Sequence, residues 1–469
     1  MRKLFSIICL VAMAVSLVFS LVGCGQTQEQ ADTLTVYNWA DYIYDYEEDF
    51  KAFYKAKTGK DVQVTYVTFD TNETMLTKVL KGDSKVDVIC PSEYAIQKLL
   101  EADFLQPINY FDGTHENSAN VNSAILSKVQ STFANLTVND VKVDVTDYFV
   151  PYMYGTLGIL YNQDVLEDAG ITTQMVEDAG WGLLFNKDAN GNKLSTAIDS
   201  RVFMKDSIRD VYVASVCYLK QMGKLDGTAY QDIPVAELIN TVDQGLVELV
   251  RNVLIEQKET LYGYEVDFGK NDLIAGVAYV DLAWSGDALY AIEEAEELGV
   301  TLNYIAPASG GNVWFDGWVI PKNATNVQGA KLFIDFLNQP QVAAANMIEI
   351  GYTSAVDKQV ILDSTDAMDV LYEGYEVDVN GATEVDDFVD YFFNDIKRYP
   401  NINDANLGIM KDFGANNQMV VMMWEGVRST GITAWALLGW TMLALGVVVG
   451  VIAVIYVVRE HKRKYVVIK

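Results

Sequence analysis

Strand-like and helix-like patterns alternate along residues 34–90, and this alternation constrains the fold more than any other feature of the chain. Apolar, strand-like runs cover 34–37, 62–67 and 86–90, and stretches with helical spacing of aromatic or apolar residues cover 44–57 and 72–80. Gly59 follows the first helical stretch, as is typical of a helix end. Strands joined by helices form parallel sheets through right-handed crossovers. The sequence therefore predicts an α/β protein with helices on both faces of its sheet.

Aromatic and acidic side chains follow two of these expected strands. Trp39, Asp41 and Tyr42 come after the first strand, and Ser92 and Tyr94, with a glutamate between them, come after the third. In open α/β sheets, ligands bind beyond the carboxyl ends of the strands. We therefore expect these residues to lie at a ligand-binding site.

A third aromatic and acidic group lies in segment 310–321, where Trp314, Asp316 and Trp318 are each two residues apart. Residues two apart share a face of a β-strand, so all three are expected to point the same way. A carboxylate between two indoles suits an organic cation, because each cation–π contact contributes roughly 0.5–2 kcal/mol. The alternative is that the tryptophans fill the core and the aspartate caps a turn.

The amino-terminal segment is typical of an export signal. A short basic start precedes an uncharged stretch at 4–22, and the sequence Leu21-Val22-Gly23-Cys24 resembles the lipobox of bacterial lipoproteins. We expect residues 1–23 to be a lipoprotein signal peptide, Cys24 to be the lipidation site and residues 24–32 to be a tether. The alternative is an ordinary signal peptide that happens to contain a cysteine.

The carboxyl-terminal segment predicts a membrane anchor. Residues 434–458 are almost wholly apolar and, as a helix, span about 37 Å, which is enough to cross a bilayer. We expect a transmembrane helix at 432–458 and a cytoplasmic basic tail at 459–469, because basic residues favour the cytoplasmic side. The region between the two ends then faces the outside of the cell. Gly446 and Gly450 leave open a contact with a partner helix.

Acidic residues dominate the chain, which has 34 Lys and Arg against 64 Asp and Glu and a net charge of −30. This balance excludes a nucleic-acid-binding protein, which needs a basic surface. It favours cationic ligands, although an acidic surface also serves solubility. About 400 residues lie between the two apolar ends, more than one core usually organises, so two lobes are expected.

Catalytic and metal-binding patterns are absent from the sequence. His115 is the only histidine between the two ends, and neither a nucleophile elbow nor a phosphate-binding loop occurs. The turn at 186–192 resembles a calcium loop but has Ala197 where the bidentate glutamate should be. Cys90 and Cys217 are expected to be buried free thiols. We expect no enzyme, no cofactor and no metal, although a pair of carboxylates leaves glycoside hydrolysis open.

Eight short motifs, in order along the chain, resemble those of the spermidine/putrescine-binding proteins of bacterial polyamine ABC importers. They are Tyr37-Asn-Trp-Ala-Asp-Tyr42, Thr71-Asn-Glu73-Thr-Met75, Cys90-Pro-Ser-Glu-Tyr94, Pro151-Tyr-Met-Tyr-Gly155, Asp206-Ser-Ile-Arg-Asp210, Trp284-Ser-Gly286, Trp314-Phe-Asp316 and Ile350-Gly-Tyr352. The resemblance implies a two-lobe periplasmic-binding-protein-like fold of type II, with two crossovers. Lobe 1 would comprise 33–150 and 315–362, and lobe 2 would comprise 151–314 and 363–428.

The same resemblance implies the roles of ten site residues. An aromatic box would surround the polyamine, Ser92 would contribute a hydroxyl, Asp316 would pair with a central or terminal amine, and Asp210 and Asp41 would pair with amines at opposite ends. The members of the box would be Trp39, Tyr42, Tyr94, Trp284, Trp314 and Tyr352. Ala40, Ser207 and Met410 depart from the family pattern, and the loss of a carboxylate at Ser207 favours putrescine or another short diamine.

The sequence thus predicts a monomeric extracytoplasmic receptor on the cell membrane that delivers a polyamine to ABC permease subunits. One alternative is a membrane-tethered sensor that signals through the helix containing Gly446 and Gly450. Another is a receptor of the same fold that binds a different small solute, such as an amino acid or an amino sugar.

Overall fold

The computed structural model describes residues 31–430 except 83–84, 267 and 380–381. The predicted signal peptide, Cys24, the predicted transmembrane helix at 432–458 and the basic tail lie outside the described residues, as does nearly all of the tether. Within the described ranges, no helix is both long and apolar enough to cross a bilayer.

A three-stranded parallel sheet forms from the first part of the chain, as the alternating pattern predicts. It comprises β1 (Asp32–Trp39), β2 (Val62–Phe69) and β3 (Val88–Ile89) in the order β2-β1-β3. The crossovers contain α2 (Glu47–Thr58) and α3 (Asn72–Leu80), and α4 (Glu93–Glu101) follows β3. Gly59, with a φ of 76°, ends α2, and the Thr71 hydroxyl accepts a hydrogen bond from the backbone N–H of Thr74 at the start of α3.

A core of aromatic side chains lies between this sheet and a later helix, α13 (Val327–Leu337). Phe50 of α2 meets Phe333 of α13 edge to face, with ring centroids 5.2 Å apart. Cys90 belongs to this core as a buried free thiol, as expected. The aromatic spacing seen in the sequence of α2 therefore serves packing against α13.

A second, eight-stranded sheet has the order β15-β12-β7-β10-β8-β9, with β11 and β14 also paired to β7. Its central strand β7 (Val150–Asn162) is buried at every position. The other strands are β8 (Val202–Lys205), β9 (Leu261–Glu265), β10 (Val280–Trp284), β11 (Leu302–Ile305), β12 (Gly311–Trp318), β14 (Thr353–Ser354) and β15 (Leu407–Gly408). The sequence patterns did not reveal β8 and β9, which are only four and five residues long.

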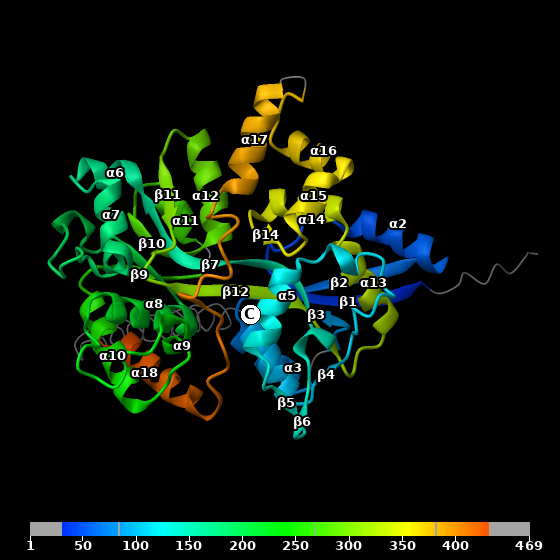
Figure 1. Ribbon diagram of the computed structural model, residues 1–469, viewed down its shortest axis with the longest axis horizontal. Coiled ribbons are helices and arrows are strands. Elements are labelled where there is room, and N and C mark those ends of the chain that lie inside the picture. Colours follow the sequence, from blue (N-terminus) through cyan, green and yellow to red (C-terminus); the bar gives the residue numbers. More distant parts are fainter. Residues whose placement is uncertain (1–30, 83–84, 267, 380–381, 431–469) are drawn as a thin grey trace, which may run out of the picture.

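Figure 1 shows β7 and β12 running across the middle of the molecule, with β1–β3 and α2 to one side and β8–β10 with their helices to the other. On that second side lie α6 (Gln163–Asp168), α7 (Thr173–Ala179), α8 (Ile208–Gln221), α9 (Val235–Leu238), α10 (Gln244–Gln257), α11 (Gly269–Ile274), α12 (Ser285–Glu297) and α18 (Asn417–Ser429). The remaining short elements are β4 (Leu105–Gln106), α5 (Ser123–Thr132), β5 (Thr137–Val138), β6 (Val141–Lys142) and β13 (Ile320–Pro321).

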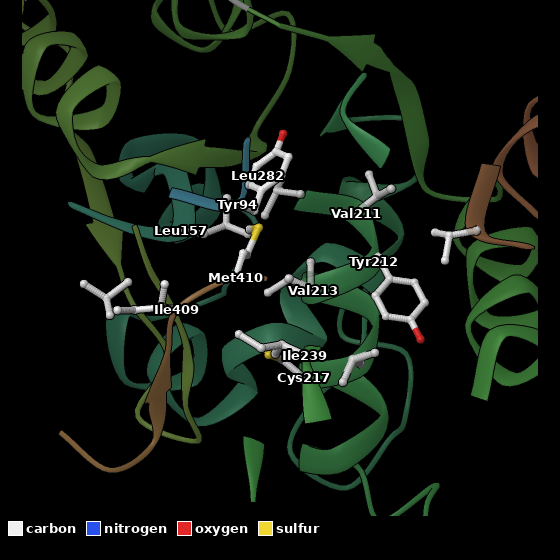
Figure 2. Packing of buried hydrophobic residues seen from close by; sticks show 14 of the residues in the cluster. Tyr94, Leu157, Val211, Tyr212, Val213, Cys217, Ile239, Leu282, Ile409 and Met410 are labelled. Carbon is white, nitrogen blue, oxygen red and sulfur yellow. The ribbon is translucent and has the colours of Figure 1, made fainter. Parts of the chain in front are cut away.

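The largest hydrophobic cluster holds α8 in place. Figure 2 shows Val211, Val213 and Cys217 of α8 in one buried group with Leu157 of β7 and Leu282 of β10. Cys217 is a buried free thiol, as expected. Because eleven of the fourteen residues of α8 are buried, the start of this helix has a rigid position in the molecule.

A separate cluster joins the helices α14 (Pro340–Ile350), α15 (Lys358–Asp363), α16 (Thr365–Gly374) and α17 (Ala382–Asn394), which lie together at the top of Figure 1. Met347 of α14, Leu371 of α16 and Phe392 of α17 are buried in it. This group extends the structure beyond the two sheets.

Candidate ligand-binding site

A cavity of about 540 Å³ lies where the carboxyl ends of strands from both sheets meet. Its lining includes residues at the ends of β1, β2, β8, β9 and β10, together with the start of α4 and part of β12. All ten residues predicted to bind the ligand line this one cavity: Trp39, Asp41, Tyr42, Ser92, Tyr94, Asp210, Trp284, Trp314, Asp316 and Tyr352.

Two groups of aromatic rings form walls of the cavity. At one wall Trp39, the last residue of β1, packs against Phe69, the last residue of the adjacent strand β2, with ring centroids 4.5 Å apart. At another, Tyr352 lies edge to face with both Tyr42 and Trp314, at 5.2 Å and 5.4 Å. The aromatic box expected from the sequence therefore draws on segments more than 300 residues apart.

Asp316 is a buried carboxylate on strand β12. The Tyr42 hydroxyl donates to its Oδ2 at 2.9 Å, whereas its Oδ1 is buried and has no hydrogen-bond partner in the described part of the chain. Burial raises the pKa of Asp316 to about 6, although the nearby hydroxyls of Ser92 and Tyr42 oppose the shift and nearby Asp210 adds to it. A buried, unpaired acceptor is costly unless a ligand donates to it.

Asp210 is the second buried carboxylate and lies in the first turn of α8. Ser207 caps this helix by accepting from the backbone N–H of Asp210 at 3.4 Å, and the Trp284 indole Nε1 lies 3.4 Å from Asp210 Oδ1. Burial raises the pKa of Asp210, although hydrogen bonds from Ser207 and Trp284 lower it. Asp210 and Trp284 therefore form a carboxylate–indole pair at the side of the second sheet.

Ser92 and Tyr94 lie at the start of α4, within a small polar network. The Asn72 amide donates to the Ser92 hydroxyl and to the Tyr94 hydroxyl, both at 3.0 Å. Tyr94 in turn donates to Glu73 Oε1 at 3.2 Å. Asn72 and Glu73 both belong to α3, so this helix fixes the orientation of the Ser92 and Tyr94 side chains.

Asp41 is the one exposed member of the predicted set. It follows β1 in a left-handed backbone conformation with a φ of 47°, which aspartate tolerates better than most residues. Its carboxylate lines the cavity from the solvent side, so water screens its charge more than those of Asp210 and Asp316.

Trp318 does not line the cavity, and the prediction that it shares the site with Trp314 and Asp316 is wrong. Its ring is fully buried against Tyr152 and Phe333, each with its centroid 5.2 Å away. The register between β12 and β7 shifts between Asp316 and Gly317, and beyond this point β12 enters the core of the first sheet. For Trp318 the alternative reading, a core tryptophan, is the correct one.

Comparison with known proteins decides the family of the chain. The sequence profile described as bacterial extracellular solute-binding protein matches residues 49–370. The chain belongs to this family. The solute-binding protein is 29% identical to the putrescine-binding periplasmic protein SpuD of Pseudomonas aeruginosa over 334 residues. This alignment covers 71% of this chain and 80% of the relative.

A second relative and a solved structure extend the likeness. The spermidine/putrescine-binding periplasmic protein of Escherichia coli is 26% identical over 371 residues, 78% of this chain and 91% of the relative. The structure of the spermidine/putrescine ABC transporter substrate-binding protein PotD from Streptococcus pneumoniae has a TM-score of 0.55 at 23% identity, covering 84% of this chain and all of that one. The solute-binding protein therefore has a periplasmic-binding-protein-like α/β fold.

Several residues that line the cavity of the solute-binding protein escaped the sequence analysis. Phe69 ends β2, Glu73 lies in the first turn of α3, and Lys205 and Glu265 end β8 and β9. The rule that ligands lie beyond strand ends predicts such positions, but it applies only once each strand is recognised. Glu93 also lines the cavity and was not predicted as a site residue. Burial raises the pKa of its carboxyl to about 8.

The cavity of the solute-binding protein is strongly acidic. Of the residues that the structure describes, three cationic ones line it, Lys205, Arg209 and Lys270. Ten acidic residues in the described part of the chain line it: Asp41, Asp70, Glu73, Glu93, Asp206, Asp210, Glu265, Asp287, Asp316 and Glu349. Among the described residues, no cluster of three or more His, Cys, Asp or Glu side chains is arranged to hold a metal ion. The excess of carboxylates therefore suits an organic cation.

Proposed function

We propose that this chain is the extracytoplasmic substrate-binding component of an ABC importer that captures a polyamine, putrescine or spermidine, and delivers it to the permease subunits. One observation carries the proposal. Buried carboxylates and aromatic rings from two sheets line a single cavity, and the buried Oδ1 of Asp316 has no partner in the described part of the chain. The relatives in Pseudomonas aeruginosa and Escherichia coli, a putrescine-binding and a spermidine/putrescine-binding periplasmic protein, support it as well.

A polyamine matches this cavity chemically. Its methylene segments would lie against the indole and phenol rings, and its ammonium groups would pair with Asp316, Asp210 and, at the solvent side, Asp41. Micromolar binding requires only about −8 kcal/mol. Two or three charge-assisted hydrogen bonds and several cation–π contacts are sufficient for this, even after the cost of ordering the ligand.

The proposal includes a division into two lobes that close over the ligand, lobe 1 with 33–150 and 315–362 and lobe 2 with 151–314 and 363–428. With these bounds the chain would cross between the lobes in β7 and in β12, the two long strands at the middle of Figure 1, and once more at the end of α15. We further propose that the protein acts without catalysis, as a monomer. A lipid at Cys24 and the apolar segment at 432–458 would hold it on the outer face of the cell membrane, with residues 459–469 in the cytoplasm.

The test is calorimetric titration of the full chain, purified in detergent, with putrescine, spermidine and spermine, and with amino acids and amino sugars as comparison ligands. The proposal predicts heat of binding and at least micromolar affinity for one or more of the polyamines. Binding of an amino acid or amino sugar, with no response to any polyamine, would mean that the cavity serves another solute.

A further inference from the structure

One of the cationic side chains that line the cavity, that of Lys205, lies beside a proposed ligand-binding carboxylate. Lys205, the last residue of β8, lines the cavity although its side chain is only 3% exposed. Its Nζ lies over the indole of Trp284, 4.7 Å from the ring centroid. The same indole carries the hydrogen bond to Asp210. Lys205 is therefore in the part of the cavity where Asp210 would receive a ligand ammonium.

The ammonium of Lys205 has the complete set of partners that a ligand ammonium would seek. It forms a buried ion pair with Glu265, donates to the carbonyl oxygen of Val266 at 2.7 Å and stacks on Trp284. Burial alone would lower the pKa of Lys205, but the carboxylates of Asp281, Glu265 and Asp287 raise it above its ordinary value. Lys205 is therefore charged at neutral pH and fills one cation position of the cavity.

Glu265, the carboxylate that pairs with Lys205, already has both of its oxygens engaged. The Glu265 carboxylate pairs with Lys205 through Oε1 and accepts from the backbone N–H of Gly269 through Oε2, at 2.9 Å. Ser207, which also lines the cavity, has a hydroxyl that caps α8, and Met410, another lining residue, has no charge. A ligand ammonium placed beside Glu265 would meet the positive charge of Lys205, while the Glu265 carboxylate is already paired.

We propose that Lys205 is a specificity-determining residue, whose ammonium occupies, against Trp284 and Glu265, the position that an additional ammonium of a longer polyamine would take. The cavity then accepts a diamine of about the length of putrescine and discriminates against spermidine. This inference rests on the proposed polyamine-binding function and identifies which polyamine that function serves.

The decisive experiment compares Lys205→Met, which keeps the length of the side chain and removes its charge, with the wild-type full chain in detergent. Calorimetry with putrescine and spermidine gives the ratio of their dissociation constants. The wild type should favour putrescine at least about tenfold, and Lys205→Met should shift the ratio towards spermidine at least about tenfold, because it frees Glu265 for a third ammonium. An unchanged ratio in a variant with a wild-type melting temperature overturns the inference.

Two matched variants test whether the charge of Lys205 or the space that its side chain fills determines the preference between putrescine and spermidine. Lys205→Arg retains the positive charge and should keep the preference of the wild type. The double variant Lys205→Met with Glu265→Gln opens the same space but offers no carboxylate, so it should show no gain for spermidine. A gain in the double variant as large as in Lys205→Met would contradict the role assigned to the ammonium.

A length series on the wild type keeps the inference testable even if Lys205→Met does not fold. The ligands are 1,3-diaminopropane, putrescine, cadaverine, spermidine and spermine. A maximum at putrescine or cadaverine supports the role of Lys205, whereas equal or tighter binding of spermidine overturns it and leaves the proposed function standing. The absence of binding to every ligand in the series rejects the proposed function itself, and this inference with it.

Discussion

Individual carboxylates set the chemistry of the cavity, and their surroundings differ sharply. Asp316 is buried, with one oxygen bonded to Tyr42 and the other without a partner among the described residues, whereas Asp41 is exposed. The desolvation of a carboxylate is offset only when a donor or a cation approaches it closely. Asp316 should therefore contribute more to the binding of an ammonium than Asp41 does.

The variant Asp316→Asn tests the contribution of this carboxylate to ammonium binding. The variant keeps the shape of the side chain but removes the charge, so a ligand ammonium is left without its counter-ion and binding should weaken by at least about 2 kcal/mol, or roughly thirtyfold. Calorimetry with putrescine measures the change. Asp178→Asn, an exposed carboxylate on α7 that does not line the cavity, is the matched control and should bind as the wild type does. Wild-type affinity in Asp316→Asn would refute the role given to Asp316.

Binding should also depend on pH through the same residue. A ligand ammonium pairs with ionised Asp316, whose pKa in the free protein is raised to about 6 by burial. The contribution of Asp316 to affinity should therefore be constant above about pH 7 and fall about tenfold for each pH unit below 6, since the carboxyl must first lose its proton. The pKa of Asp210 is raised too, so its titration acts in the same direction.

Titrations at pH 7.5, 6.0 and 5.0 measure this dependence. In Asp316→Asn the residue at this position does not titrate, so the slope between pH 6 and 5 should be shallower than in the wild type. Equal slopes in the two proteins would assign the pH dependence to another group.

At the scale of the elements, close backbone packing decides where the aromatic walls stand. The start of α12 passes directly under Tyr352, and a Cβ added at Gly286 would lie 2.2 Å from atoms of that ring. On β7, a Cβ at Gly155 would lie 2.7 Å from Trp314. Both glycines therefore allow a helix or a strand to approach a ring of the site closely.

Gly286→Ala should displace the ring of Tyr352, because overpacking of this kind costs about 1–3 kcal/mol. We expect putrescine binding to weaken about tenfold and the melting temperature to fall. Gly426→Ala in α18 is the control, since a Cβ there meets nothing within 4 Å, and it should be neutral or slightly stabilising. Calorimetry and thermal unfolding of both variants check the prediction, and equal behaviour of the two would contradict it.

At the scale of the whole molecule, one buried carboxylate links helices from the two sides of the structure. Asp412, which is nearly buried, lies 3.3 Å from Lys98 of α4 and 3.3 Å from Arg209 of α8. Its backbone N–H donates to Gln97 at 2.9 Å. The guanidinium of Arg209 also stacks on Tyr94, 4.3 Å from the ring centroid. The segment around Asp412 thus ties α4, and with it Tyr94 of the site, to α8.

Asp412→Asn should destabilise the protein by about 3 kcal/mol, because it leaves the buried charge of Arg209 without its partner. Urea unfolding measures the change. Glu248→Gln breaks an ion pair with the same 3.3 Å separation, Glu248–Arg251, but one that is exposed, and it should cost less than about 1 kcal/mol. Similar losses in the two variants would show that the bridge through Asp412 does not hold the two sides together.

Much of the fold and of the site follows from short-range sequence patterns. The order of β1, α2, β2, α3 and β3 was predictable because helical and strand periodicities are local properties of the chain. The sequence position of Trp39 or Ser92 just after a strand also identified it as a site candidate. The short strands β8 and β9 gave no periodic signal, and Lys205 and Glu265 at their ends were missed.

The sequence by itself determined the chemical character of this protein: an acidic α/β chain whose aromatic and acidic residues follow its strands. Only the tertiary structure decided that Trp318 enters the core, that Gly286 lies under Tyr352 and that Lys205 pairs with Glu265 within the cavity. The physical reason is the range of the interactions. Helical and strand periodicity acts over a few residues, whereas strand register, ring packing and buried ion pairs depend on segments that meet only after the chain has folded.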